Sequence, residues 1–114
     1  MPAHLAAQQR AAIAERAALV QAEQLRVQVE AELASARSTL VALAEAVALA
    51  AQNQKIAEEG VQLAQQRLDA GAATALEVRD AALKLTVAQL TLVNARIDAL
   101  VARSELNRAA GGAP

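Results

Sequence analysis

One convincing break, at Ala70 to Thr74, separates two long helix-forming runs in this sequence. Gly71 can adopt the positive φ angle that ends a helix. Thr74 can cap the helix that follows, and Glu77, three residues later, completes a T-x-x-E capping box. Both signals place the boundary at the same point. The chain is therefore predicted to turn back on itself here.

The fold class predicted is all-α, a long antiparallel helical hairpin. The first helix is expected over about residues 5–70, the turn over 71–74 and the second helix over about 75–109, before Gly111 and Gly112. Alanine is the commonest residue and favours helix over strand. The absence of aromatic residues indicates a thin object of helices packed side by side. With 114 residues, the chain is expected to form a single domain over 1–114.

A second break is the alternative. Ser35, Ser38 and Thr39 are the weakest helix formers in the first run, and a break near 35–39 would produce a three-helix bundle. Because this segment contains neither glycine nor proline, a continuous helix is the preferred prediction.

The first run carries a heptad repeat, which is typical of a helix in a coiled coil. One position of the repeat holds Leu5, Ala12, Leu19, Arg26, Leu33, Leu40, Val47, Gln54, Val61 and Leu68. The other holds Gln8, Glu15, Ala22, Val29, Ala36, Leu43, Ala50, Ala57 and Ala64. The repeat is mixed before Val29 and apolar after it, except at Gln54.

The second run carries a sharper repeat. Its two positions hold Val78, Leu85, Leu92, Ala99 and Leu106, and Ala81, Ala88, Ala95, Ala102 and Ala109. An alanine column lets two helix axes approach to the short end of the usual range of about 8–10 Å. Further apolar residues lie off these repeats, at Leu49, Ile56 and Leu63 in the first run and at Leu76, Leu83, Leu90 and Ile97 in the second. A helix with two apolar stripes needs two neighbours.

Several classes of function are excluded by composition. Eleven basic and twelve acidic residues are spread along the chain, so nucleic acid is not an expected partner. We predict no catalytic, cofactor-binding or metal site and no enzyme: there is no cysteine, His4 has no second ligand at helical spacing, and Ser104 and Thr74 have no histidine near them. No signal peptide is recognised at the start of this chain. The chain has no uninterrupted apolar run of 18 residues, so direct membrane insertion is not expected.

The residues around the turn and in the last helix resemble a known family. They are the runs Ala70-Gly71-Ala72-Ala73-Thr74-Ala75-Leu76-Glu77-Val78-Arg79-Asp80-Ala81, Asn94-Ala95-Arg96-Ile97-Asp98-Ala99-Leu100 and Ser104-Glu105-Leu106-Asn107-Arg108-Ala109-Ala110-Gly111. Together they are similar to the second repeat of TolC-type outer-membrane efflux ducts. In that family a long helix descends to a G-x-x-T turn, an acidic E/D-V-x-D-A segment follows, and the return helix ends at a glycine.

The resemblance implies a periplasmic coiled-coil hairpin of an outer-membrane efflux or secretion channel, in which three copies of a two-repeat chain build a hollow α-barrel. Its partners would be a periplasmic adaptor protein and an inner-membrane pump. The resemblance makes Ala70, Gly71, Ala72, Ala73 and Thr74 the tip that contacts the adaptor. Glu77 and Asp80 match the family's acidic positions near the periplasmic entrance, although both are also first-turn acids that favour a helix N-terminus.

This sequence departs from well-known members of the family. Leu68 and Ala73 stand where some members carry a tyrosine and an arginine that tie neighbouring helices, and the β-strands and the other repeat are missing. Two alternatives stay open: an adaptor hairpin of the membrane-fusion type, and a stand-alone or engineered coiled-coil association module.

Because the first predicted helix is much longer than the second, its early part has no partner within the hairpin. We predict that the chain forms a dimer or higher oligomer in solution, in which segments of about residues 5–35 pair with each other. Light scattering should give a mass above that of one chain. A mass of one chain at high concentration would contradict the prediction.

Overall fold

The computed structural model describes residues 2–112 and contains two α-helices. Helix α1 spans Pro2–Asp69 and helix α2 spans Ala75–Ala109. The predicted all-α helical hairpin is confirmed: α2 has the expected bounds, and the ends of α1 differ from those expected by one to three residues. The three-helix alternative is wrong, because α1 continues without a break through Ser35, Ser38 and Thr39. Without a glycine or proline, these weak helix formers do not interrupt the backbone hydrogen bonds of the helix.

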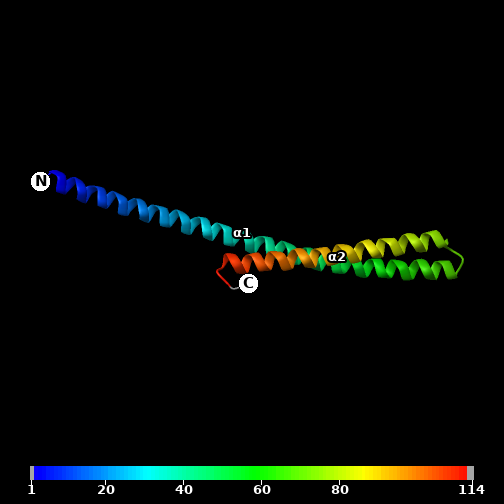
Figure 1. The fold of residues 1–114 in the computed structure, drawn as a ribbon. Helices are drawn as coiled ribbons and strands as arrows, with labels where there is room; N and C mark the ends of the chain where they lie inside the picture. The colour runs from blue at the N-terminus through cyan, green and yellow to red at the C-terminus, as the bar shows by residue number, and fades with distance from the viewer. Residues whose placement is uncertain (1, 113–114) are drawn as a thin grey trace. The chain divides into compact units, whose positions relative to one another are not determined.

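The chain divides into two compact units, with the boundary between Ser35 and Ala36. The first unit, described from residue 2 to 35, is a single stretch of helix. The second, described from residue 36 to 112, is the hairpin formed by the rest of α1, the turn and α2. Figure 1 shows α2 lying beside this part of α1.

The helical stretch of residues 2–35 is almost wholly exposed, with only Ala6 and Leu33 half-buried. Arg26 stands at a predicted seam position and forms ion pairs with Glu30, at 2.7 Å, and with Glu23. The hydrogen bond from Arg26 lowers the pKa of the Glu23 carboxyl. The charge around Arg26 is therefore balanced within one helix, and the heptad positions of residues 2–35 are mixed in polarity and exposed apart from Leu33.

In the hairpin, the residues shielded from solvent are those of the predicted heptad repeats. On α1 they are Ala36, Leu40, Leu43, Val47, Ala50, Gln54, Ala57, Val61, Ala64 and Leu68. On α2 they are Val78, Ala81, Leu85, Ala88, Leu92, Ala95, Ala99, Ala102 and Leu106, together with Ser104. The pattern confirms the coiled-coil seam, and only the last alanine of the predicted column, Ala109, is exposed.

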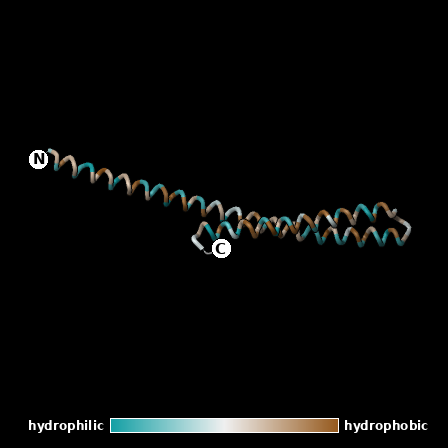
Figure 2. The backbone as a smooth tube through the Cα atoms, viewed as in Figure 1, coloured by the Kyte–Doolittle hydropathy of each residue, from teal (hydrophilic) through white to brown (hydrophobic). Residues whose placement is uncertain are grey.

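The seam is narrow, since a pair of helices can enclose little volume. Among the described residues, only Ala50, Leu92 and Ala102 are buried, and each keeps 5–8% of its surface exposed. Two of these three are alanines, whose small side chains let the helix backbones come close together. Figure 2 shows hydrophobic residues recurring along both arms of the hairpin.

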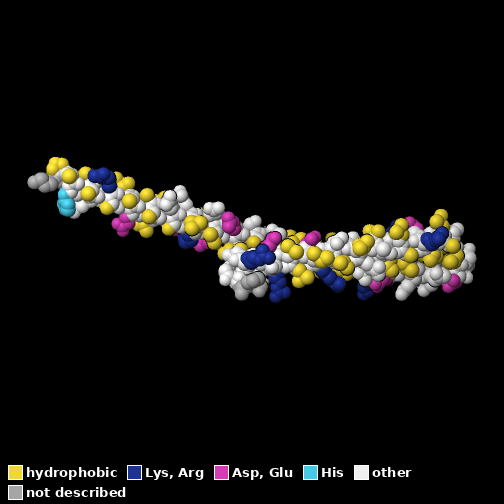
Figure 3. All heavy atoms as spheres, viewed as in Figure 1, with side chains coloured by type: hydrophobic (Ala, Val, Ile, Leu, Met, Phe, Trp, Pro, Cys, Tyr) yellow, Lys and Arg dark blue, Asp and Glu magenta, His cyan; other side chains and the backbone are white. Residues whose placement is uncertain are grey.

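A second set of apolar side chains lies outside the seam, as predicted. We call Leu76, Leu83, Leu90 and Ile97 the α2 row, and Leu49, Ile56 and Leu63 the α1 row. Every member of both rows is between 51% and 72% exposed. Figure 3 shows hydrophobic side chains on the surface of both arms of the hairpin. Each arm thus has one apolar face covered by the other arm and one that this chain leaves in solvent.

The contrast between Leu92 in the seam and Leu90 in the α2 row gives a matched pair of substitutions. Leu92→Ala removes a leucine that is only 5% exposed, and we expect it to lower the free energy of unfolding by about 2 kcal/mol, near the lower end of the range for buried leucines. Leu90→Ala should change it by less than about 0.5 kcal/mol in dilute solution. Urea unfolding followed by circular dichroism measures both. Equal losses would contradict the assignment of the seam.

Candidate functional site

The turn between the two helices is built by local hydrogen bonds. Helix α1 ends at Asp69, and Gly71 takes a φ angle of 75°. The Gly71 N–H donates to the Leu68 carbonyl oxygen at 2.9 Å, and the Ala72 N–H donates to that of Arg67 at 2.7 Å. This pair of bonds is the Schellman arrangement, which satisfies the last carbonyl groups of a helix and requires a residue in the left-handed region. Gly71 therefore plays the predicted role.

Helix α2 begins with the predicted capping box. The Glu77 N–H donates to the Thr74 hydroxyl oxygen at 3.2 Å, and the Thr74 N–H donates to the Glu77 carboxylate at 2.8 Å. Two backbone N–H groups that have no acceptor within the helix thus each donate to the side chain of the other residue. The turn is held in one conformation by residues that lie close together in the sequence.

The predicted tip lies in this turn. Ala70, Gly71, Ala72 and Thr74 are exposed, while Ala73 is half-buried. The Arg67 guanidinium donates to the Ala72 carbonyl oxygen at 3.1 Å. The tip therefore presents small side chains and backbone groups on a fixed frame, a surface suited to close contact with another backbone.

The two predicted entrance carboxylates lie on the first turns of α2, and both are exposed. Glu77 is engaged in the capping box, and Asp80 forms an ion pair with Lys84 at 3.1 Å. Each therefore has a local structural role. Both also face the same open groove, so the structure does bring them together on one side of the hairpin.

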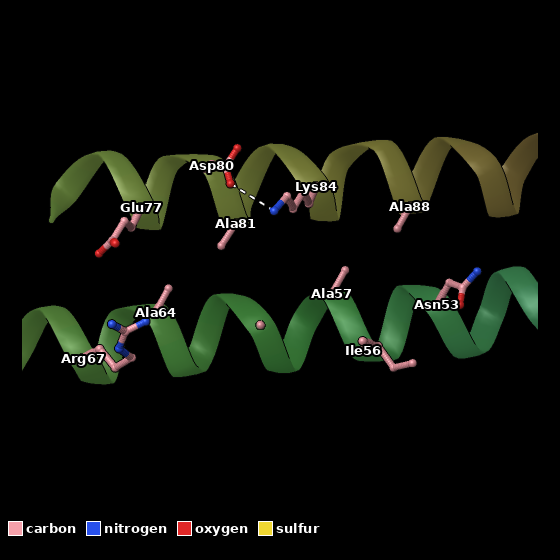
Figure 4. A pocket seen from close by; sticks show the side chains of 11 residues that line it. Asn53, Ile56, Ala57, Ala64, Arg67, Glu77, Asp80, Ala81, Lys84 and Ala88 are labelled. Atoms are coloured by element: carbon pink, nitrogen blue, oxygen red, sulfur yellow. Dashed lines mark ion pairs between the residues drawn. The ribbon is translucent and has the colours of Figure 1, made fainter. Parts of the chain in front are cut away.

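This groove, of about 580 Å³, runs between the arms near the tip (Figure 4). Its floor is lined by alanines from both helices, among them Ala57, Ala64, Ala81 and Ala88, and its rim carries polar groups from Asn53, Arg67, Glu77, Asp80 and Lys84. The groove is open because the residues that line its floor are small. A methyl group added at Gly60 would meet no atom within 4 Å.

Sequence reasoning missed the part that Arg67, Lys84 and Gly60 play in this groove. A signal was present for each. Lys84 follows Asp80 by four residues, the spacing of an ion pair on one helix face. Asn53, Gly60 and Arg67 recur every seven residues, so they share one edge of α1.

The groove and tip present small side chains, backbone groups and charged side chains, which can bind by shape and charge. No group of three or more metal-binding side chains lies together among residues 2–112. Nor does this described part contain a buried side-chain polar atom without a hydrogen-bond partner.

Comparisons with protein-family models, curated proteins and solved structures found no match to this chain. The resemblance to the efflux ducts rests on the sequence motifs around the turn and in the last helix.

Alanine substitutions at Gly71 and Gly60 are expected to have opposite effects on the free energy of unfolding. Gly71→Ala puts a Cβ into the left-handed region and should lower the free energy of unfolding by about 1 kcal/mol. Gly60→Ala adds a methyl group to open space inside α1 and should raise it by roughly 0.5–1 kcal/mol, because glycine is a poor helix former. Thermal unfolding of the two variants beside the parent chain measures both. A stabilised Gly71→Ala variant would show that the turn differs in solution.

Proposed function

We propose that this chain is a structural wall segment of a periplasmic α-helical duct, part of an outer-membrane efflux or secretion channel of the TolC type. In the parent channel, three copies would form the barrel. The hairpin would stand between neighbouring helices and carry no catalytic activity. The proposal is supported by the sequence motifs and by the surface of the hairpin.

The exposed rows on both arms are the observation that carries the proposal. Monomeric soluble proteins rarely leave contiguous apolar patches of more than a few hundred Å² in water, and larger ones mark sites of interaction. Here the α2 row covers three heptads on the side of the helix away from the seam. A wall of helices covers such rows, because each helix then has a neighbour on two sides.

The tip supports a second part of the proposal, contact with a periplasmic adaptor that links the duct to an inner-membrane pump. Gly71 and Thr74 hold the loop in a fixed shape, and the other side chains of the loop are alanines. Glu77 and Asp80 lie on the first turns of helix behind it, where copies arranged around an axis would form a ring of carboxylates at the entrance.

Insertion of the helices into a bilayer is the main competing explanation for the exposed apolar residues. Each helix does contain an 18-residue window that is apolar enough to cross a membrane by length and composition alone. In α2, a central position would place Arg96 and Asp98 in the bilayer, where a charged residue costs up to about 2.5–3.5 kcal/mol at the helix centre. If the apolar rows pack against other helices in water, Arg96 and Asp98 stay solvated. We therefore favour a wall segment without direct insertion into a bilayer.

The adaptor contact is tested by photo-crosslinking in the source organism. A photoreactive residue at Ala72, in the tip, should crosslink the full-length parent to a periplasmic adaptor, whereas the same residue at Ala14 should not. Mass spectrometry identifies the product, and cell fractionation should place the parent in the outer membrane. Crosslinks that cluster at residues 10–40 and spare the turn would refute the tip contact.

A stand-alone coiled-coil association module is the second candidate, and the exposure of residues 2–35 favours it. This stretch exposes Leu5, Ile13, Leu19, Val20, Leu25, Val27 and Val29, which another helix could cover. In that case the parent protein would assemble through these residues. Cell fractionation would find it outside the outer-membrane fraction, and a photoreactive residue in its tip would crosslink to no adaptor.

A further inference from the structure

The α1 row and the α2 row lie at matching heights on the hairpin. Figure 4 shows Ala64 and Ala57 of α1 directed toward α2, and Ala81 and Ala88 of α2 directed toward α1, with Ala81 next to Ala64 and Ala88 next to Ala57 along the seam. Because the two helices are antiparallel, residues nearer the start of α1 lie level with residues nearer the end of α2. By this count, Leu63, Ile56 and Leu49 lie at heights near those of Leu83, Leu90 and Ile97, and both rows have the same spacing of seven residues.

The residues beside the two rows are complementary as well. Beside the α2 row lie Asp80, Val87 and Asn94, and beside the α1 row lie Arg67, Gly60 and Asn53. Each of these flanking residues lies four positions after a residue of its row, so both flanking sets are rotated in the same direction about their helix axes. When two helices pack antiparallel through their rows, flanking sets of this kind come to lie opposite each other.

At matching heights, the pairs across such a contact would be favourable ones. Asp80 would lie opposite Arg67, which pairs opposite charges, and Asn94 opposite Asn53, which pairs two amides. Val87 would lie opposite Gly60, where the groove has open space for a side chain. On the other edges of the rows, Arg79 would meet Gln66 and Thr86 would meet Glu59, so no like charges oppose each other.

From this match we propose that the α2 row binds the α1 row of a second copy of this chain, side by side, antiparallel and with the two tips level. The second copy is the partner that the observations favour, because spacing, height and charge all match between two surfaces of the same chain. The contact rests on the proposed function in one respect, since it names the surface through which wall segments would meet.

The contact joins two different surfaces, so it does not close on itself. Each pair of hairpins leaves one α1 row and one α2 row free, and a further copy can add at either side. Such heterologous contacts give rings when the rotation closes and open filaments when it does not. Self-association is therefore expected to continue beyond the dimer.

Cysteine pairing between two variants of the full chain tests this contact, because the native sequence has no cysteine. A mixture of Leu90→Cys and Ile56→Cys chains should form a disulfide-linked heterodimer under mild oxidation, since level residues in facing rows come within the Cα separation of about 4.4–6.8 Å that a disulfide needs. Neither variant alone should crosslink efficiently.

The matched control is a mixture of Leu90→Cys and Leu49→Cys chains. Leu49 lies in the same row, but one heptad away, a displacement of about 10 Å along the helix. It should give little heterodimer. The proposal is overturned if this control crosslinks as well as the level pair, if Leu90→Cys chains crosslink mainly to one another, or if light scattering finds single chains only.

A second measurement uses the space at Gly60. A Cβ at Gly60 meets no atom within 4 Å in the isolated chain, and the side chain of Gly60→Leu would meet Val87 of the second copy, so self-association should weaken by about tenfold or more. Gln62→Leu, which adds the same side chain on the other side of α1, should leave association nearly unchanged. Circular dichroism checks that both variants keep their helices. Equal association of the two variants would refute the contact, and this result is independent of whether the tip crosslinks to an adaptor.

Discussion

A single apolar seam between two helices holds the hairpin together, and most of its other properties follow from the narrowness of that seam. A helix that meets one neighbour can bury only about one stripe of its surface. Leu92 is buried because it projects toward α1, while Leu90, two residues before it on the same helix, is 59% exposed. Chemically identical side chains therefore differ in burial through their position in the heptad alone.

Alanine makes this seam possible without aromatic residues. Ala50 and Ala102 are buried although each offers only a methyl group, as expected where small side chains let two helices approach closely. The same small residues leave a groove near the tip, where Ala57, Ala64, Ala81 and Ala88 form the floor. Close packing in one direction thus creates a hollow on the neighbouring face, with Gly60 at its edge.

The turn is specified locally, in contrast to the seam. Gly71, Thr74 and Glu77 form the helix stop and the capping box through bonds between residues at most five positions apart. This is why the G-x-x-T-x-x-E pattern predicted the turn almost to the residue. It also explains why Glu77 has a structural role, whatever further role its carboxylate has in an assembly. The expected entrance carboxylate and the helix cap are one and the same group.

The sequence by itself determined the two helices, the turn between them and the residues of the seam, because these depend on propensity, capping and heptad spacing, which are local or periodic. Continuity through Ser35 and Thr39 was also predictable from the absence of glycine and proline. Tertiary structure alone decided which α1 residue stands level with which α2 residue, and so brought Gly60 and Arg67 to one groove with Asp80 and Lys84. These residues are far apart in the chain, and their heights depend on how tightly the alanine seam lets the two helices approach and on how the turn sets their register.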